Sequence, residues 1–303
     1  MSRPVSYQEA SARERLQQLF DAGSFEEFLP PSARVISPHL GQLNAPVAFD
    51  DGVAVGRARL NGVTVYTAAQ EGGFMGGAVG EVHGAKLVGL LRRAVQDQAT
   101  AVVLLVESGG VRLHEANAGL IAVSEVMRAL LDARAAGVPV IVLVGGANGA
   151  FGGMGIVARC ANVVIMSEEG RLAMSGPEVI ETASGVEEFD ARDRALVWRT
   201  TGGKHRYLMG DCQTIVADDI AAFRAAAAQA MATLTGAQQQ AVQLSLSALE
   251  AEQAMLAQRI ERYGQLRDPV DIWSAMGIAD AANLPMLDVD QFIAVAGQCR
   301  MGA

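Results

Sequence analysis

The sequence predicts an α/β protein in which parallel strands are flanked by helices. Two stretches carry this prediction, because each is an apolar run followed by a glycine-rich turn and a helical pattern. The first run is 101–107 (AVVLLVE) and the second is 138–144 (VPVIVLV). Both are continuous rather than alternating, which is typical of parallel strands covered on both faces. The repeated order of strand and helix favours right-handed crossovers between neighbouring strands.

The composition restricts the class of protein. The chain has 303 residues, of which 50% are hydrophobic, and its formal net charge is −9. It therefore has enough apolar material for a large core. No basic block or stripe is present, so nucleic-acid binding is not expected. The cysteines form no CxxC pair or metal-ligand set, so we expect a reducing compartment and no metal; they are Cys160, Cys212 and Cys299.

No stretch of the sequence favours a membrane or export. The first 20 residues, MSRPVSYQEASARERLQQLF, contain no apolar signal core. Residues 135–158 carry no charge and are numerous enough to cross a bilayer. Their apolar run is short and β-branched, however, and the remainder is glycine-rich, which favours a strand and a loop. We expect a cytoplasmic protein without a membrane span.

The N-terminal part predicts a helix followed by a hairpin. Residues 11–28 predict a helix, a turn at Gly23 and a second short helical turn. Residues 52–60 and 63–69 predict two strands, joined by the Asn61-Gly62 turn that is a strong hairpin signal. We expect one domain over residues 1–303, with an N-terminal helical arm at 5–30.

Three glycine-rich passages from strand to helix follow. The first, residues 70–86, precedes a helix that runs to Gln96. The strand at 101–107 leads to a helix at 115–136, and the strand at 138–144 leads to a helix that starts near Gly153. If these two strands are parallel neighbours, their glycine turns face each other across one pocket.

The next segment predicts short elements and then a loop. Residues 162–166 predict a strand and residues 171–174 a short one. The Ser175-Gly176-Pro177 turn precedes a helix at 178–182, because proline is favoured at a helix start. Residues 185–211 are charged and irregular, which predicts a loop or lid.

The C-terminal part predicts helices. Residues 218–233 form an alanine-rich pattern, and residues 237–264 predict a long C-terminal helical segment. This segment carries an apolar stripe for which intramolecular packing and a subunit interface are comparable explanations; its members are Leu244, Leu249, Leu256 and Ile260. Residues 268–277 close the predicted order of elements.

The candidate functional residues lie in the second glycine turn, GGANGAFGGMG. Backbone N–H groups at a helix N-terminus lack internal partners, and the helix dipole favours an anion there. Glycine allows a ligand to approach that backbone. We therefore interpret Gly152 and Gly153 as parts of an oxyanion hole. The alternative is that these glycines only allow tight packing.

Three segments resemble the carboxyltransferase subunits of acyl-CoA carboxylases. SARERLQQLFDAGSFEEF resembles their opening segment, and SGGVRLHEANAGL resembles their SGGxRxxE turn. GGANGAFGGMGIVARCANVVIMSEEGRLAMSGPEVIE resembles their second glycine turn and the helix start after it. The resemblance spans most of residues 11–182, in the right order and spacing. It implies a crotonase-type ββα superhelix, as in the ClpP/crotonase-like folds.

Within this superfamily the chain is most similar to the β-subunit family of biotin-independent malonate decarboxylases. It has no four-cysteine zinc ribbon and no AMKM biotin-attachment motif. It is also half of a two-domain carboxyltransferase unit, which implies a γ-type carboxyltransferase-like partner. The resemblance implies decarboxylation of malonyl-S-acyl-carrier protein to the acetyl thioester. It further implies that this chain binds no cofactor, that the acyl-carrier protein subunit has a CoA-derived, phosphopantetheine-type arm, and that the complex contains an acyl-CoA transferase subunit.

The resemblance also assigns roles to residues of the two turns. Loss of CO2 leaves an enolate, and the N–H groups of Gly152 and Gly153 are expected to bind its oxygen. Gly109 and Gly110 match the first turn, shape the other wall and are candidate donors, although packing alone also explains them. Substrate-lining positions are expected at the turn residues Ser108, Gly149, Ala150, Ser175 and Gly176.

Several polar residues have two interpretations. Arg112 is a candidate for the malonyl carboxylate, but an arginine clamped there opposes CO2 loss, so pairing with Glu107 or Glu115 is favoured. His114 is a candidate proton donor, with a surface or structural role as the alternative, and His83 is undecided. The Lys204-His205-Arg206 run is either a basic lip for the carrier or a solvated loop.

Four other functions remain open. The first is the carboxyltransferase β subunit of a biotin-dependent enzyme. The second is a crotonase-type acyl-CoA hydratase or isomerase, which needs a Glu pair near the second turn, whereas no carboxylate lies between Asp132 and Glu168. The third is a crotonase-fold serine peptidase, which needs a serine that residues 149–153 do not supply. The fourth is a scaffold whose partner performs the chemistry.

Overall fold

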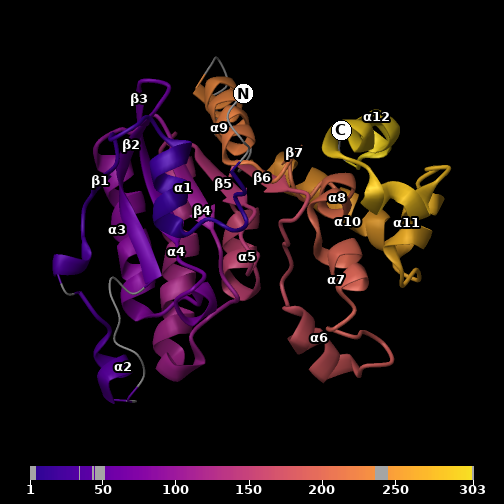
Figure 1. Cartoon of the computed structure of the whole chain (residues 1–303), viewed down its shortest axis with the longest axis horizontal. Coiled ribbons are helices and arrows are strands. Elements are labelled where there is room, and N and C mark those ends of the chain that lie inside the picture. The colour runs from indigo at the N-terminus through magenta and orange to yellow at the C-terminus, as the bar shows by residue number, and fades with distance from the viewer. Residues whose placement is uncertain (1–4, 34, 43, 45–51, 236–244, 302–303) are drawn as a thin grey trace.

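A seven-stranded sheet forms the centre of the computed structural model, which describes residues 5–33, 35–42, 44, 52–235 and 245–301 (Figure 1). The strands follow one another across the sheet in chain order. They are β1 (Glu26–Glu27), β2 (Val53–Leu60), β3 (Val63–Gln70), β4 (Val102–Val106), β5 (Val140–Val144), β6 (Val163–Ser167) and β7 (Thr214–Val216). The first three are antiparallel, and β3 to β7 are parallel. The predicted α/β fold with mostly parallel strands is confirmed.

Helices cover both faces of this sheet. Alternate residues of β4 pack into different cores, with Val102 and Leu104 on the side of α3, α4 and α5, and Val103 on the side of α1 and α9. Double-sided burial explains why this strand is a continuous apolar run in the sequence. The helices of the two layers are α1 (Ala12–Leu19), α3 (Glu81–Gln96), α4 (Asn117–Ala135), α5 (Gly152–Arg159) and α9 (Ile220–Thr235).

A second set of parallel pairings lies beyond the ends of the strands. Single bridges join Val79 to Val111, Ser108 to Ala150, and Ala150 to Leu172. Each repeat therefore contains a sheet strand, a short paired segment and a helix, and successive repeats stack side by side. This is the crotonase-type ββα superhelix, and it places the glycine turns in consecutive layers.

Two short elements differ from the sequence-based predictions. The predicted second helical turn before Phe28 is wrong, because Glu26 pairs with the sheet edge and its carboxylate contacts Arg57 at 2.8 Å. The predicted strand at 171–174 is also wrong. Arg171 and Leu172 form only isolated bridges, to Gly202 and Ala150.

Much of the segment 185–211, which was predicted as a loop or lid, is helical, although residues 185–193 are turns and irregular chain. The segment contains α7 (Arg194–Thr201) and α8 (Gly203–Leu208), after α6 (Pro177–Ser184). The Asp193 carboxylate caps α7 by accepting the Leu196 N–H at 3.0 Å. The charged residues in this segment suggested a solvated loop. In the structure several of them form ion pairs instead, among them Arg199, Lys204 and Arg206.

The C-terminal part packs around a core of its own, separate from the two faces of the sheet. Leu208, Trp273 and Phe292 are buried in it. Its elements include α11 (Pro269–Ala275) and α12 (Val289–Ala296), which lie beside α8 in Figure 1. The remaining helices are α2 (Pro38–Gln42), near the N-terminus, and α10 (Leu246–Tyr263).

Helix α10 buries none of its residues. Leu249 is 51% exposed and Ile260 is 73% exposed, while Leu256 is half-buried. Leu244 and the start of the predicted 237–264 segment lie outside the described residues. Intramolecular packing therefore does not explain the exposed part of the stripe, and a subunit interface stays a prediction.

Within the part of the chain that the structure describes, no helix combines the length and the apolar character needed to cross a membrane.

Candidate active site

The two predicted glycine turns lie against each other at the ends of β4 and β5. The Ser108 N–H donates to the Gly149 carbonyl at 2.7 Å, and the Phe151 N–H donates to the Ser108 carbonyl at 2.8 Å. A methyl group added at Gly152 would stand 3.0 Å from the Gly110 Cα. The expectation that these turns are neighbours is therefore confirmed, and a pocket between them stays a prediction.

The N-terminus of α5 has two donors without an acceptor among the described residues, the N–H groups of Gly153 and of the buried Met154. The Gly152 N–H donates to the Met174 carbonyl at 3.0 Å, so in this structure it is not available to a ligand. The neighbouring Gly153 N–H has no acceptor among the described residues, and Gly153 is only half-buried. The helix dipole favours an anion at this position. Of the two glycine N–H groups that were predicted to bind the oxyanion, only that of Gly153 is unoccupied in this structure, and its role as a donor stays a prediction.

The packing explanation for Gly153 also holds. A Cβ at this residue would stand 2.5 Å from Cγ1 of Val123 on α4. Glycine is therefore required here by the close approach of α4 and α5, whether or not its N–H binds a ligand.

In the first turn, the backbone N–H groups of Gly109 and Gly110 already donate to acceptors within the protein. The Gly109 N–H is used by the Gly76 carbonyl at 2.8 Å, and the Gly110 N–H points to the Ser108 hydroxyl at 3.2 Å. Gly109 itself is exposed. Both N–H groups therefore have acceptors within the protein, and donation to substrate by these glycines stays a prediction.

The other predicted lining residues contribute backbone rather than side chains. Ser108 and Ala150 are buried, and the Ala150 N–H donates to the Arg171 carbonyl at 2.8 Å. Gly149 accepts the Ser108 bond already described. Ser175 and Gly176 are half-buried and lead from Met174 into α6. The structure brings Ser108, Gly149 and Ala150 together. Ser175 and Gly176 follow Met174, whose carbonyl accepts the Gly152 N–H.

Arg112 is structural. Its side chain is fully buried, its Nη1 lies 3.2 Å from the Glu115 carboxylate, and its Nε donates to the Ala78 carbonyl at 2.9 Å. The expected pairing with Glu115 is confirmed, and the buried side chain does not reach an exposed surface in this structure. Arg112 instead joins the first turn to the segment before α3.

The histidines lie in different environments. His114 is exposed in the short turn Leu113–Glu115, at the surface near His39. His83 is buried, and its Nε2 lies 2.9 Å from Gln70 Nε2. Among the described histidines, His114 and the partly exposed His39 are accessible to a proton-transfer partner, whereas His83 and His205 are buried.

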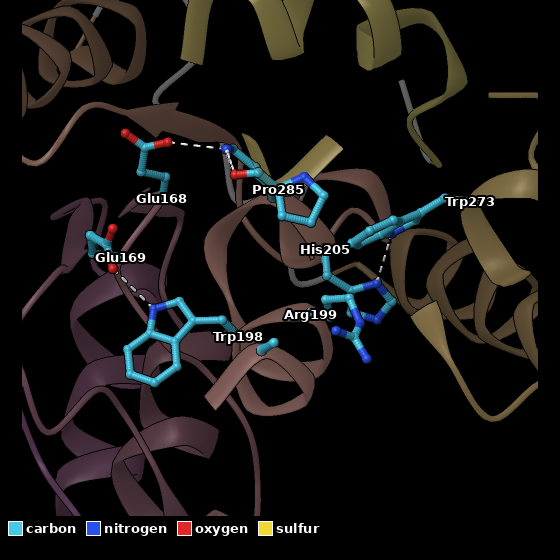
Figure 2. A pocket seen from close by; sticks show the side chains of 9 residues that line it. Glu168, Glu169, Trp198, Arg199, His205, Trp273 and Pro285 are labelled. Atoms are coloured by element: carbon cyan, nitrogen blue, oxygen red, sulfur yellow. Dashed lines mark hydrogen bonds and ion pairs between the residues drawn. The ribbon is translucent and has the colours of Figure 1, made fainter. Parts of the chain in front are cut away.

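Neither interpretation of residues 204–206, a basic lip or a solvated loop, holds, because Lys204 and His205 are buried in α8. Figure 2 shows His205 beside Trp273. The Lys204 ammonium donates to the Pro285 carbonyl at 3.0 Å and lies 3.1 Å from the Glu168 carboxylate. His205 Nδ1 accepts the Trp273 indole N–H at 3.2 Å. Burial, and then the Arg206 charge, lowers the pKa of His205 to about 3, so it is neutral.

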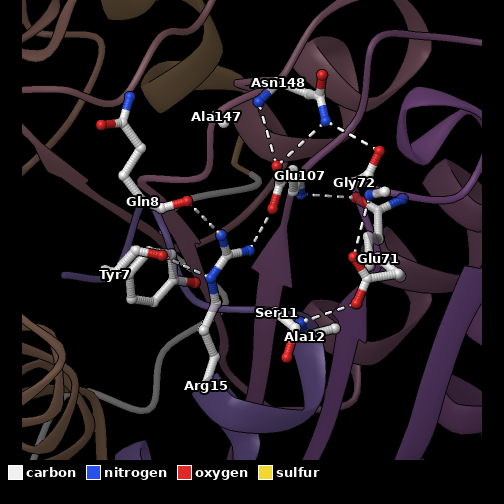
Figure 3. A network of polar contacts seen from close by, with 12 residues as sticks. Tyr7, Gln8, Ser11, Ala12, Arg15, Glu71, Gly72, Glu107, Ala147 and Asn148 are labelled. Carbon is white, nitrogen blue, oxygen red and sulfur yellow. Dashed lines mark hydrogen bonds and ion pairs between the residues drawn. The ribbon is translucent and has the colours of Figure 1, made fainter. Parts of the chain in front are cut away.

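A buried carboxylate beneath the turns was not recognised in the sequence (Figure 3). Glu107 ends the β4 run, and its carboxylate forms an ion pair with Arg15 of α1. The same carboxylate accepts the Asn148 backbone and side-chain N–H groups, both at 3.2 Å. An acidic residue at the end of an apolar strand indicates that a positively charged or hydrogen-bonding group is buried beside it. The sequence does not show which group this is, because Arg15 lies 92 residues away in the chain.

Exposed apolar side chains occur in the segments next to the turns. Leu113 follows the first turn and is 86% exposed, and Met174, whose carbonyl accepts the Gly152 N–H, is 71% exposed. Val179, on α6, is 60% exposed. Exposed apolar groups of this size suit contact with a protein partner, which stays a prediction.

Comparison with protein families matches residues 8–271 to the carboxyl transferase domain. A malonyl-S-ACP:biotin-protein carboxyltransferase, MADC, from Malonomonas rubra is 39% identical over 310 residues, covering 96% of this chain and 95% of that protein. The acetyl-coenzyme A carboxylase carboxyl transferase subunit beta of Fusobacterium nucleatum is 31% identical over 58% of this chain and 59% of that subunit.

Solved structures give the same relationship. A chain of a Pseudomonas malonate decarboxylase hetero-tetramer in complex with malonate superposes with a TM-score of 0.78 at 37% identity, covering 88% of this chain and 95% of that chain. A chain of the Pseudomonas MdcD-MdcE hetero-dimer gives a TM-score of 0.62 at 37% identity, covering 75% of this chain and 88% of that one. The resemblance identified from the glycine turns is therefore confirmed.

Proposed function

Because this chain belongs to the carboxyl transferase domain family, we propose that it decarboxylates a malonyl thioester in a site completed by a partner subunit. The observation that supports this most directly is the free Gly153 N–H at the start of α5, beside the Gly109-Gly110 turn. The named activity of the similar Pseudomonas complex, malonate decarboxylation, favours the same substrate class.

The proposed reaction breaks the bond between the malonyl carboxylate carbon and the adjacent CH2. CO2 leaves, and the electron pair of that bond passes into the thioester as an enolate. The Gly153 N–H donates to the enolate oxygen, where charge develops, and such a preorganised donor stabilises the transition state. A proton delivered to the CH2 carbon then gives the acetyl thioester. His114 is an exposed histidine near the first turn and is a candidate for that proton transfer.

The proposed partners follow from the same comparison. A γ-type carboxyltransferase-like subunit would cover the exposed apolar residues Leu113, Met174 and Val179. An acyl-carrier protein subunit would present the malonyl group on its CoA-derived, phosphopantetheine-type arm, and an acyl-CoA transferase subunit would load it. This chain itself would bind no cofactor.

A second function is favoured by one observation. The similar Malonomonas rubra protein is named as a malonyl-S-ACP:biotin-protein carboxyltransferase, so transfer of the carboxyl group to biotin is the alternative fate of CO2. The two functions share the enolate and differ in the acceptor.

The deciding experiment uses the assembled complex. This chain is co-purified with its γ-type and carrier subunits, and CO2 release from the malonyl carrier is measured with and without a biotinylated carrier protein. Release without biotin supports the decarboxylase. Carboxyl transfer that requires the biotinylated protein supports the alternative, and neither product in an intact complex contradicts both.

A further inference from the structure

We infer that Glu107 is a positioning residue that holds the second glycine turn in place for the Gly153 N–H. Its carboxylate receives two bonds from Asn148, the backbone N–H and the side-chain Nδ2, each at 3.2 Å. Asn148 directly precedes Gly149, whose carbonyl accepts the Ser108 N–H. The carboxylate thus connects the end of β4 to the loop that leads into α5 (Figure 3).

The surroundings of Glu107 are built to keep its carboxylate in one position. Arg15 supplies the opposite charge and is itself 1% exposed. The Arg15 Nε donates to the Tyr7 carbonyl at 2.8 Å, which fixes the guanidinium. A Cβ at Gly72 or Gly146 would stand 2.2 or 2.4 Å from carboxylate atoms of Glu107, so both glycines leave room for it.

The backbone of Glu107 is fixed as well. Its N–H donates to Gln70 Oε1 at 3.2 Å, and Gln70 lies against His83. Glu107 and Ser108 together receive or donate four hydrogen bonds to residues 148–151 of the second turn. Gly153 follows two residues later, so a displaced turn moves its N–H away from the position of the enolate oxygen.

This inference rests on the proposed function for its effect on rate, but it makes a structural claim that is measurable without activity. Removal of the acceptor for Asn148 should loosen the turn, whereas removal of the charge alone should not. Two double variants separate these effects. In Arg15→Met with Glu107→Gln, no buried charge remains and an amide oxygen still accepts from Asn148. In Arg15→Met with Glu107→Met, the acceptor is also gone.

The first measurement is amide hydrogen exchange of residues 145–153 in the complex with the partner subunits. We expect exchange close to the wild-type rate in the Gln double variant and faster exchange in the Met double variant. Equal exchange in both overturns the inference, whatever the enzyme does. If the Met double variant fails to fold, Asn148→Ala is used, which removes only the side-chain donor and should also speed exchange in this turn.

The second measurement is malonyl-thioester decarboxylation by the same complexes. We expect kcat in the Met double variant to fall by about 10²-fold relative to the Gln double variant, with KM unchanged, because a donor to the developing oxyanion has moved. Equal kcat in the two variants overturns the positioning role. If the wild-type complex shows no turnover while the exchange difference is present, the proposed function fails and the positioning of the turn stands.

Discussion

The carbonyl oxygen of Met174 accepts the Gly152 N–H at 3.0 Å, and this bond decides which of the two predicted glycine donors of α5 is free. Met174 belongs to the segment before α6, so a residue from the next layer of the superhelix occupies the first donor of the helix. Of the two predicted glycine donors, Gly153 is therefore the one whose N–H has no acceptor among the described residues. A pair of glycines in the sequence therefore has two different roles in the structure.

The first prediction separates two effects of a substitution at Gly153: the loss of its N–H donor and the steric clash of an added side chain. A Cβ at Gly153 meets Val123, so both substitutions are made in a Val123→Ala background, which removes the γ carbons of the clash. Gly153→Ala keeps the N–H and should retain most activity. Gly153→Pro removes it and should lower kcat by about 10²–10³-fold.

The measurement is malonyl-thioester decarboxylation, with thermal unfolding and partner binding recorded for each protein. Val123→Ala alone is the reference. Equal loss of activity in the alanine and proline variants would show that the added atoms, rather than the missing donor, cause the defect.

The second prediction concerns Gly152. Its φ of +57° is strained for an L side chain, and the Gly110 Cα lies 3.0 Å from its would-be Cβ. Gly152→Ala should destabilise the chain by about 1–2 kcal/mol from conformation, with an additional cost from the contact. Gly137→Ala is the matched control, since its φ is +81° and nothing lies within 4 Å. Urea unfolding measures both, and an equal loss would mean that the Gly110 contact costs nothing.

The sequence predicted the parallel core and the meeting of the turns because both are local signals. Apolar runs such as 102–106 define the strands, and Asn61-Gly62 defines the hairpin. It did not predict which N–H is free, because that depends on Met174, which is distant in sequence from the turn. It likewise did not predict that Lys204 and His205 are buried, and offered a basic lip or a solvated loop instead, because the Pro285 carbonyl and the Trp273 indole that contact them lie about 70–80 residues further on.

The third prediction concerns Asp211, on which three arginines from different helices converge. Arg206 lies 3.0 Å away, Arg259 lies 2.9 Å away and Arg159 lies 3.8 Å away. Burial raises the pKa of Asp211, but these charges together lower it below its usual value. Asp211→Asn leaves the arginines without their shared anion and should destabilise the chain by about 3 kcal/mol.

The control for Asp211 is an exposed ion pair. Glu188 lies 3.0 Å from Arg267, and both side chains are largely solvated. Glu188→Gln should therefore change the unfolding free energy by less than about 1 kcal/mol. Chemical denaturation at neutral pH compares the two variants. Similar small losses would mean that the arginine charges near Asp211 are compensated by solvent or by Glu252, whose carboxylate lies 3.6 Å from Arg159.

The fourth prediction is an acid sensitivity that comes from His205. Its pKa is about 3 when folded, because of burial and then the Arg206 charge, and about 6.5 when unfolded. Between these values the unfolded chain binds a proton that the folded chain does not. His205 should therefore lower the unfolding free energy by up to about 1.4 kcal/mol for each unit that the pH falls below about 6.5, and contribute nothing to the pH dependence above it.

The matched variant is His205→Asn, whose amide oxygen can still accept the Trp273 indole N–H that Nδ1 accepts at 3.2 Å. Urea unfolding of both proteins is measured between about pH 5 and pH 7.5, above the range in which most carboxylates titrate. The wild-type chain should lose stability toward pH 5 more steeply than His205→Asn, and the two should have parallel profiles above about pH 6.5. Parallel profiles over the whole range would mean that the folded chain accommodates a charged His205, and that burial in α8 does not exclude a proton.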